Sequence, residues 1–307
     1  MMQLRPYLRT TAATLAAAVL AVAALVIAPG QDPADAQPPG TPSKPAIFHN
    51  GTWYLRNSMT TGAANLTFPY GRQGDIPVMG DWDGNGTDTV GIVRFTEVAP
   101  FTFVYTWHLK NTNSGGAASV APFQFGGVRF VAVDQLGTIP VVGDWNGDGV
   151  DTIGVVYYDF DLDGPVRWEL RNSNVSGPAD IVMNYGRGRD IPLTGDWDGN
   201  GTDTPGVVRN TTWLLRNAAG GGSANVSFPY GSASTVEINV PGDWDGNGTD
   251  TPAVLRNIPS SNEEGPFQHW LFRNSNSGGA ASGQIVFGGS AQTVSLPIEY
   301  SPRLSWK

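Results

Sequence analysis

The chain has 307 residues, no cysteine, and a formal net charge of −9 with a pI near 4.7. The acidic balance argues against nucleic acid and against an anionic membrane surface as the main partner. The lack of cysteine excludes disulfide bonds and thiol chemistry. With 40 glycines and 23 prolines, turns must be frequent, and the length suits one large all-β domain or two smaller ones.

Residues 1–36 are typical of a secretory signal peptide. Arg5 and Arg9 precede an uncharged, alanine-rich stretch over residues 11–28, and residues 34–36 (Ala-Asp-Ala) offer a cleavage site between small residues. An uncleaved membrane anchor is the alternative, although this stretch is at the short edge for a span. We expect a secreted or cell-surface protein whose mature chain has no membrane span and starts with a proline-rich linker at residues 37–45.

Four short segments then recur in a fixed order, each rich in β-branched or aromatic residues and bounded by turn residues, as expected of strands. Segment a, of the type Pro-Val-x-Gly-Asp-Trp, occurs at residues 77–82, 140–145, 192–197 and 240–244. Segment b, of the type Gly-Val-Val-Arg, occurs at residues 91–94, 154–157, 206–209 and 253–256. Segment c, of the type Trp-x-Leu-Arg-Asn, begins at Trp53, Trp107, Trp168, Trp213 and Trp270. Segment d, which ends in aromatic-Gly, occurs at residues 68–71, 123–126, 183–186, 228–231 and 286–288.

The order of these segments predicts the architecture. Four strands in a unit of roughly 45–60 residues match a propeller blade. After the linker the chain opens with b, c and d, four complete a-b-c-d units follow, and a lone a-like segment comes last at residues 296–300. We therefore predict an all-β, five-bladed β-propeller of four-stranded blades over residues 46–301, closed by the C-terminal strand joining the N-terminal blade, with a tail at residues 302–307. An open sandwich or two separate domains are the alternatives.

Each complete unit carries an acidic loop of eight residues that starts at the Asp of segment a. Oxygen-bearing side chains occupy loop positions 1, 3 and 5, a glycine at position 6 permits a sharp turn, and position 7 offers its carbonyl. Ca²⁺ takes about six to eight oxygen ligands, and the lack of His or Cys nearby disfavours transition metals. Plain Asp-Gly and Asn-Gly turns are the alternative. We predict up to four Ca²⁺ ions, held by Asp81, Asp83, Asn85, Thr87 and Asp88; by Asp144, Asn146, Asp148, Val150 and Asp151; by Asp196, Asp198, Asn200, Thr202 and Asp203; and by Asp243, Asp245, Asn247, Thr249 and Asp250.

The cassette Gly-Asp-Trp-Asp-Gly-Asn-Gly, followed by a short β segment, resembles the FG-GAP/VCBS-type repeat, which is related to integrin α-chain propellers. The resemblance covers about residues 46–300 and implies an exported bacterial-type repeat protein with a Ca²⁺-binding loop between two strands of one blade. The family loop usually ends with Asp at position 9, whereas here Asp stands at position 8 and Thr at position 9. The last ligand is therefore the Asp, the Thr hydroxyl or water.

For function, the sequence favours a non-catalytic binding or interaction module, monomeric, whose ligand is a glycan or another protein. No catalytic or cofactor-binding residue stands out, and the three histidines are interpreted as substitutions on a repeat scaffold. Nine of the ten tryptophans belong to the repeat, which favours packing over sugar binding. Insertions between segments b and c, at residues 95–106, 158–167 and 257–268, indicate one binding face. A polysaccharide-active enzyme, a glycoside hydrolase or lyase, is the alternative by fold analogy.

Overall fold

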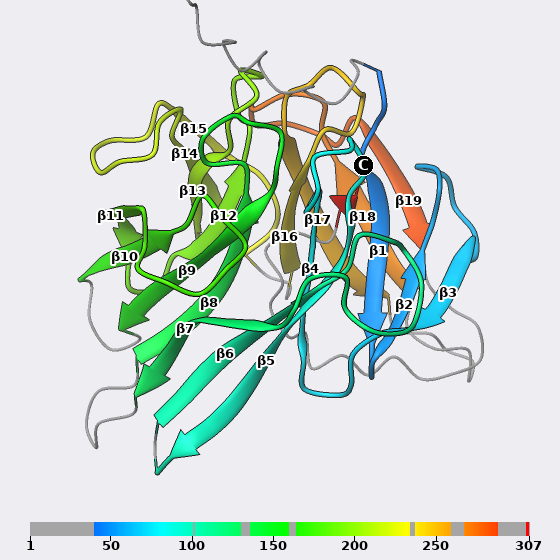
Figure 1. The fold of residues 1–307 in the computed structure, drawn as a ribbon. Helices are drawn as coiled ribbons and strands as arrows, with labels where there is room; N and C mark the ends of the chain where they lie inside the picture. Colours follow the sequence, from blue (N-terminus) through cyan, green and yellow to red (C-terminus); the bar gives the residue numbers. More distant parts are fainter. Residues whose placement is uncertain are drawn as a thin grey trace, which may run out of the picture. The chain divides into compact units, whose positions relative to one another are not determined.

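The structure is a computed structural model that describes residues 40–100, 102–129, 136–159, 164–233, 237–258, 267–287 and 305–306. All of these belong to one compact unit, residues 31–307. The described residues contain no helix and form five four-stranded antiparallel sheets, which confirms the predicted five-bladed β-propeller (Figure 1).

Each sheet is one blade, and the blades follow the order of the repeat. Blade 1 contains β20 (Ser305–Trp306), β1 (Lys44–His49), β2 (Thr52–Leu55) and β3 (Leu66–Pro69). Blade 2 contains β4 (Ile76–Gly80), β5 (Thr89–Ala99), β6 (Thr102–Leu109) and β7 (Phe123–Arg129). Blade 3 contains β8 (Leu136–Gly143), β9 (Thr152–Asp159), β10 (Pro165–Leu170) and β11 (Ile181–Arg187). Blade 4 contains β12 (Ile191–Gly195), β13 (Thr204–Arg209), β14 (Thr212–Leu215) and β15 (Val226–Pro229). Blade 5 contains β16 (Glu237–Gly242), β17 (Thr251–Ile258), β18 (Phe267–Phe272) and β19 (Gly283–Phe287).

Burial falls from the inner to the outer strands of a blade, and the sequence follows this gradient. In β13 the first five residues are all buried, whereas β14 alternates between half-buried and buried residues. The outermost strand β3 is mostly exposed. A strand covered on both faces needs a continuous apolar run, and a strand covered on one face needs alternation. Segments b and c therefore differ in pattern because neighbouring blades cover both faces of the first and mainly one face of the second.

The ring is closed at blade 1, where a C-terminal strand pairs with an N-terminal one. Lys44 pairs with Trp306 and Pro45 with Ser305, and Figure 1 shows the red end of the chain beside blue β1. The inner strands β4, β8, β12, β16 and β20 contact one another in turn, and β20 also contacts β4. The a-like segment at residues 296–300 lies outside the described residues. The described closing strand, Ser305–Trp306, falls instead among the residues expected to form a tail.

Five hydrophobic clusters hold the blades together, and the repeated tryptophans lie inside them. One cluster joins blade 3 to Val207 of blade 4, and another joins blade 4 to Val254 of blade 5. The tryptophans of segment c are fully buried, and each of four donates its indole N–H to a carbonyl of segment d, as Trp53 does to Tyr70 at 3.0 Å. The four loop tryptophans are also buried. These nine side chains are therefore structural, as interpreted from their repetition.

The connections between strands b and c differ among the blades. Blades 1 and 4 have tight turns in which Asn50 and Asn210 adopt positive φ angles of 49° and 57°. In blade 2 the insertion at residues 95–106 extends both strands into a long β5–β6 hairpin, which projects from its sheet in Figure 1. The rings of Phe95 and Phe103 stack on this hairpin with centroids 4.4 Å apart. The tips of the other two insertions lie partly outside the described residues.

Candidate functional site

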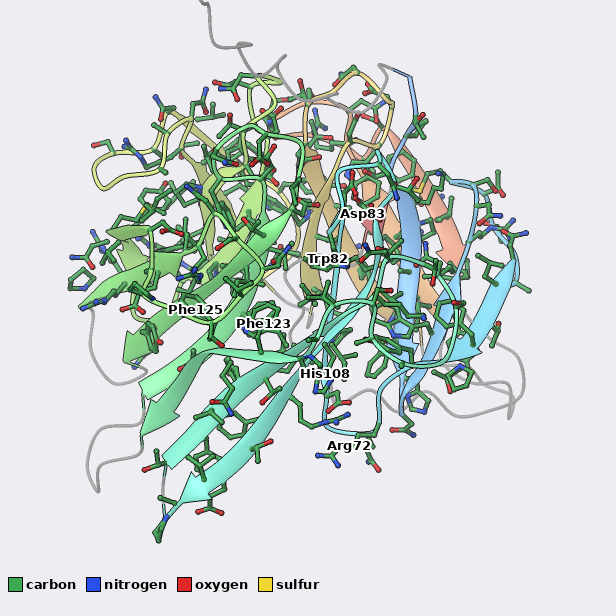
Figure 2. All side chains as sticks on the ribbon, in the orientation of Figure 1. Arg72, Trp82, Asp83, His108, Phe123 and Phe125 are labelled. Atoms are coloured by element: carbon green, nitrogen blue, oxygen red, sulfur yellow. The ribbon has the colours of Figure 1, made fainter. Side chains whose placement is uncertain are left out.

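The four acidic loops connect the two innermost strands of blades 2 to 5, and their backbones share one conformation. In each loop the glycines at positions 4 and 6 have positive φ angles, between 70° and 88°. A side chain at these φ angles is strained, which is why glycine recurs at position 4 as well as at position 6. Figure 2 shows the loop residue Asp83 and the turn residue Arg72 at opposite ends of blade 2. The loops therefore lie on one face of the propeller and the d–a turns on the other.

The Asp at position 1 is buried, and the loop amides surround its carboxylate. In the β8–β9 loop, Asp144 accepts hydrogen bonds from the amides of Gly147 at 2.7 Å, Asp148 at 3.1 Å and Gly149 at 2.7 Å. Burial raises the pKa of Asp144, as does the nearby Asp151 carboxylate, while the amide hydrogen bonds oppose the shift. Burial likewise raises the pKa of Asp81 and of Asp196. Each such loop thus holds a desolvated negative charge beside further carboxylates.

Loop positions 3 and 5 carry oxygen side chains that face solvent or are half-buried. The side chains of Asp83, Asn85 and Asp198 are exposed. At position 5 the side-chain oxygen also caps the loop, since Asn85 accepts the amide of Thr87 at 2.9 Å and Asp148 accepts that of Val150 at 3.0 Å. These oxygens remain accessible to a hydrated cation from outside the blade.

The Asp at position 8 joins neighbouring blades. The Asp151 carboxylate accepts the backbone N–H of Asp81 in the preceding blade at 2.8 Å, and the Asp151 amide donates to the carbonyl of Asp81 at 2.8 Å. Asp203 makes the same two contacts with Asp144, and Asp250 makes them with Asp196. We call this reciprocal pair of hydrogen bonds the blade clasp. It accounts for the Asp at position 8 in the loops of blades 3, 4 and 5 independently of any metal.

Between blades 5 and 1 a serine replaces this aspartate. The Ser43 hydroxyl accepts the backbone N–H of Asp243 at 2.9 Å, and the Ser43 amide donates to the Asp243 carbonyl at 2.6 Å. In addition, the Gly40 amide donates to the Gly246 carbonyl at 2.6 Å. Residues 40–43 thus continue the row of loops into blade 1, although the sequence predicted only a linker there.

The threonine at position 9 also has a structural partner. Its hydroxyl donates to the last carbonyl of strand a, for example from Thr152 to Gly143 at 3.2 Å. The single hydroxyl hydrogens of Thr204 and Thr251 have a second, nearer acceptor in segment c, the carbonyls of Arg216 at 2.6 Å and Arg273 at 2.7 Å. Across the described parts of the chain, no three acidic or histidine side chains converge where a metal ion could sit. A cation in a loop would therefore be held by the oxygens of positions 1, 3, 5 and 7 together with water.

Three asparagines beneath the loops were missed by the sequence reasoning. Asn113 donates its side-chain amide to the carbonyl of Asp88 at 3.0 Å, and Asn174 donates to that of Asp151 at 2.9 Å. Asn276 donates to the carbonyls of both Asp250 and Trp197. The Oδ1 atoms of these three asparagines are buried and have no hydrogen-bond partner among the residues that the structure describes. The available signal was an asparagine two residues after the Asn of segment c.

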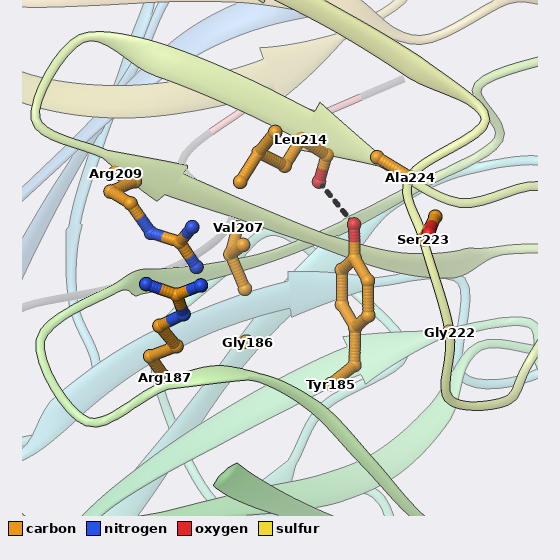
Figure 3. A pocket seen from close by; sticks show the side chains of 9 residues that line it. All are labelled: Tyr185, Gly186, Arg187, Val207, Arg209, Leu214, Gly222, Ser223 and Ala224. Carbon is orange, nitrogen blue, oxygen red and sulfur yellow. Dashed lines mark hydrogen bonds between the residues drawn. The ribbon is translucent and has the colours of Figure 1, made fainter. Parts of the chain in front are cut away.

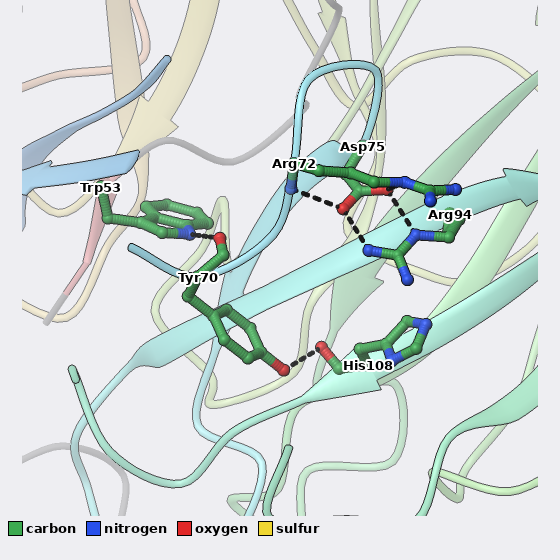
Figure 4. A network of polar contacts seen from close by, with 6 residues as sticks. All are labelled: Trp53, Tyr70, Arg72, Asp75, Arg94 and His108. Carbon is green, nitrogen blue, oxygen red and sulfur yellow. Dashed lines mark hydrogen bonds and ion pairs between the residues drawn. The ribbon is translucent and has the colours of Figure 1, made fainter. Parts of the chain in front are cut away.

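The opposite face carries ion pairs between the d–a turn and the end of strand b. Asp75 accepts two hydrogen bonds from the Arg94 guanidinium, at 2.8 and 2.7 Å, and also caps the amide of Arg72 (Figure 4). Asp190 binds Arg209 in the same way, and Glu237 binds Arg256 at 2.5 Å. Asp75 and Asp190 were not among the acids that the sequence analysis singled out, although Gly-Arg-x-x-Asp-Ile-Pro precedes strand a in both blades.

The three histidines occupy three different blades. Burial lowers the pKa of His108, and the Arg94 guanidinium lowers it further. The backbone carbonyl of His108 accepts the Tyr70 hydroxyl at 3.0 Å (Figure 4). His49 contacts Asn50, and His269 contacts Gln284. The rings of His49 and His269 thus make contacts within their own blades, whereas the backbone of His108 binds Tyr70 of the neighbouring blade.

No protein-family model, curated protein or solved structure matches the chain. Within the described residues there is no helix long and apolar enough to cross a membrane. The fold and the site geometry are therefore the basis for any functional assignment.

Proposed function

We propose that this protein is a secreted, Ca²⁺-binding propeller of the FG-GAP/VCBS type that acts as a non-catalytic binding module for a glycan or protein outside the cell or at its surface. The observation that carries the metal proposal is the buried carboxylate at loop position 1. Its negative charge is desolvated and lies near further carboxylates, as in the pair of Asp81 and Asp151. A bound cation would offset this charge at each loop.

The loop residues divide into two groups with different expected roles. Positions 1, 3 and 5 supply side-chain oxygens and position 7 supplies its carbonyl, so these positions are proposed to bind Ca²⁺. Positions 8 and 9 already have partners in the clasp and in strands a and c, which supports water as the remaining ligand. An incomplete protein ligand set suits weak binding, with a Kd of about 10⁻⁴–10⁻³ M as in extracellular modules.

Calorimetric titration of the mature chain with Ca²⁺ tests this proposal. We expect the isotherm of Asp198→Ala to lose one site, while its unfolding in EDTA remains that of the wild type, since Asp198 is exposed. Mg²⁺ serves as the comparison, because it prefers a smaller octahedral site. A chain that shows no Ca²⁺ heat and the same melting temperature in Ca²⁺ and EDTA would show that the loops are only turns.

The binding role is supported by the long β5–β6 hairpin. Phe95 and Val98 are large apolar residues exposed by 36% and 56%, and Phe95 stacks on Phe103. Exposed apolar side chains gathered on a projecting loop of a rigid scaffold are typical of a contact surface for another molecule. This hairpin is one of the three insertions between segments b and c, which the sequence analysis assigned to a single binding face.

A glycan array and a test on immobilised polysaccharides, both in Ca²⁺, address this role. We expect Phe95→Ser to weaken ligand retention, whereas Val182→Ser is the control because Val182 is also an exposed apolar residue, 55% exposed, but lies on a different strand. Release of reducing or unsaturated sugar ends from a polysaccharide would instead support the enzyme alternative. Equal retention by wild type and Phe95→Ser would exclude the hairpin from the binding surface.

A further inference from the structure

A pocket of about 380 Å³ lies between the outer strand of blade 3 and the strands of blade 4. Tyr185 and Arg187 of β11 line one wall, and Arg209 and Leu214 line the other. Ser223, in the glycine-rich connection before β15, closes one end. The volume is at the small end of the range for small-molecule sites, about 300–1,000 Å³. The pocket is separate from the acidic loops and from the β5–β6 hairpin.

Two guanidinium groups face each other at the other end of this pocket. Figure 3 shows the side chains of Arg187 and Arg209 pointing toward one another. Arg209 binds the buried Asp190 carboxylate through two hydrogen bonds, at 2.8 and 2.7 Å. The same carboxylate also accepts the backbone N–H of Arg187, so its oxygens already have several donors. Of the two guanidinium groups, only that of Arg209 is thus paired with this carboxylate.

The Arg187 guanidinium is exposed and, among the described residues, makes no ion pair or side-chain hydrogen bond. Arg216 adds a third cation, with its guanidinium carbon 5.9 Å from the centre of the Tyr185 ring. The local charge is therefore positive, although the whole chain carries −9. A guanidinium presents parallel N–H donors that match a carboxylate or a phosphate.

Two other junctions between blades differ from this one at the position of Arg187. Between blades 1 and 2, Arg72 lies 3.8 Å from Asp75 and therefore has a carboxylate partner. Between blades 4 and 5, Ser232 stands in the place of Arg187. The residues at these equivalent positions can therefore serve as controls for the pair of Arg187 and Arg209.

We propose that this pocket binds a small oxyanion ligand, a carboxylate or a phosphate held between Arg187 and Arg209. The rest of the ligand would lie over Val207 and Leu214 and reach Ser223 at the far end. Burial raises the pKa of Tyr185 to about 12, so its hydroxyl stays neutral and continues to donate to the Leu214 carbonyl at 3.0 Å. Tyr185 therefore adds no negative charge to the pocket wall.

Titration of the mature chain with glucuronate, glucose and inorganic phosphate, followed by NMR or calorimetry, tests this proposal. We expect glucuronate or phosphate to bind with a Kd of about 1 mM or tighter, and neutral glucose to bind far more weakly. Preference for glucuronate would identify a carboxylate ligand, and preference for phosphate a phosphorylated one. Absence of binding by both anions, or equal binding of glucose and glucuronate, overturns the proposal.

Variants at Arg187 localise the effect. Arg187→Ala should raise the Kd about tenfold or more, and Arg187→Lys should fall in between because lysine lacks the two parallel donors. Arg72→Ala, at the equivalent position between blades 1 and 2, should leave the Kd unchanged. Because the Arg187 side chain is exposed, the unfolding curve of Arg187→Ala should match that of the wild type. Unchanged affinity in Arg187→Ala overturns the assignment of this pocket.

Discussion

At loop position 8 a single carboxylate bridges two blades. Asp203 is 5% exposed, and its oxygen accepts the backbone N–H of Asp144 at 2.9 Å. A buried N–H without an acceptor costs about 1–3 kcal/mol. The side chain therefore contributes to stability whether or not a metal is bound, in contrast to the exposed side chain of Asp198 in the same loop.

Replacement of Asp203 separates the clasp from metal binding. Asp203→Ala should lower the free energy of unfolding by about 1–3 kcal/mol in EDTA, because the Asp144 amide loses its acceptor. Asp203→Asn keeps an acceptor oxygen and should cost less. Urea unfolding measures both, with Asp198→Ala as the control that should match wild type in EDTA. A wild-type curve for Asp203→Ala would contradict the clasp.

His108 should make stability depend on pH. Its folded-state pKa is lowered, so the unfolded chain takes up a proton at a higher pH than the folded chain does. Its contribution is fully present above the unfolded pKa of about 6.5 and is lost as the pH falls toward the folded pKa.

Leucine occupies the equivalent position of blades 4 and 5, at Leu214 and Leu271, so His108→Leu is the matched variant. We expect this variant to lose less stability than wild type between about pH 6.5 and 5, while the difference between the two chains stays constant above pH 7. Urea midpoints measured across this range provide the check. Parallel curves at all pH values would refute the role of His108.

At the level of elements, blades 2 to 5 are attached in turn by clusters of apolar side chains and by the clasps. Blade 1 is the exception, because its inner strand and its remaining strands come from opposite ends of the chain. Residues 40–43 supply the missing loop contacts, and the Gly246 backbone lies so close that a Cβ there would be 2.9 Å from the Gly40 carbonyl carbon. The junction of blades 5 and 1 therefore depends on a short segment ahead of β1.

Ser43 tests this junction. Ser43→Ala removes the acceptor for the Asp243 amide and should lower the free energy of unfolding by about 1–3 kcal/mol. Ser43→Asp restores the residue found at this place in the other blades, and we expect it to retain most of the stability. Thermal unfolding of both variants distinguishes the hydroxyl contact from a general effect of substitution, which would lower the melting temperature equally in both.

At the level of the whole molecule, β20 makes the array of blades into a ring. It pairs with β1 and contacts the inner strands of both neighbouring blades. A propeller without it would expose the edge of β1, and an exposed strand edge invites pairing with another chain. The closing strand therefore protects the molecule from association as well as stabilising it.

A chain that ends at residue 304 lacks β20 and tests this view. We expect its melting temperature to fall by at least about 5 °C, which corresponds to a loss of a few kcal/mol in a domain of this size. We also expect it to self-associate with rising concentration, as measured by light scattering. A monomer with unchanged melting temperature would show that the two-residue strand is dispensable for closure.

The sequence by itself determined the strands, their grouping into five blades and the glycines of the acidic loops. These features rest on local signals, namely apolar runs, repeated tryptophans and turn residues, which recur in register along the chain. The repeats also identified the side-chain oxygens at loop positions 1, 3 and 5 as candidate Ca²⁺ ligands. Ca²⁺ binding itself stays a prediction.

Only the tertiary structure decided which residues meet across blades. The Asp203 carboxylate belongs to the blade after Asp144, and Ser43 meets Asp243 from the other end of the chain. The sequence predicted closure by a C-terminal strand, but the two residues of β20 are too short to show a period, so their place in the sheet was not predicted. The facing arginines were missed because Arg187 and Arg209 lie in different repeats. The hydrophobic pattern within a repeat indicates which side chains of each strand are buried. Contacts between repeats depend instead on how the closed ring of blades places residues that are distant in the sequence next to one another.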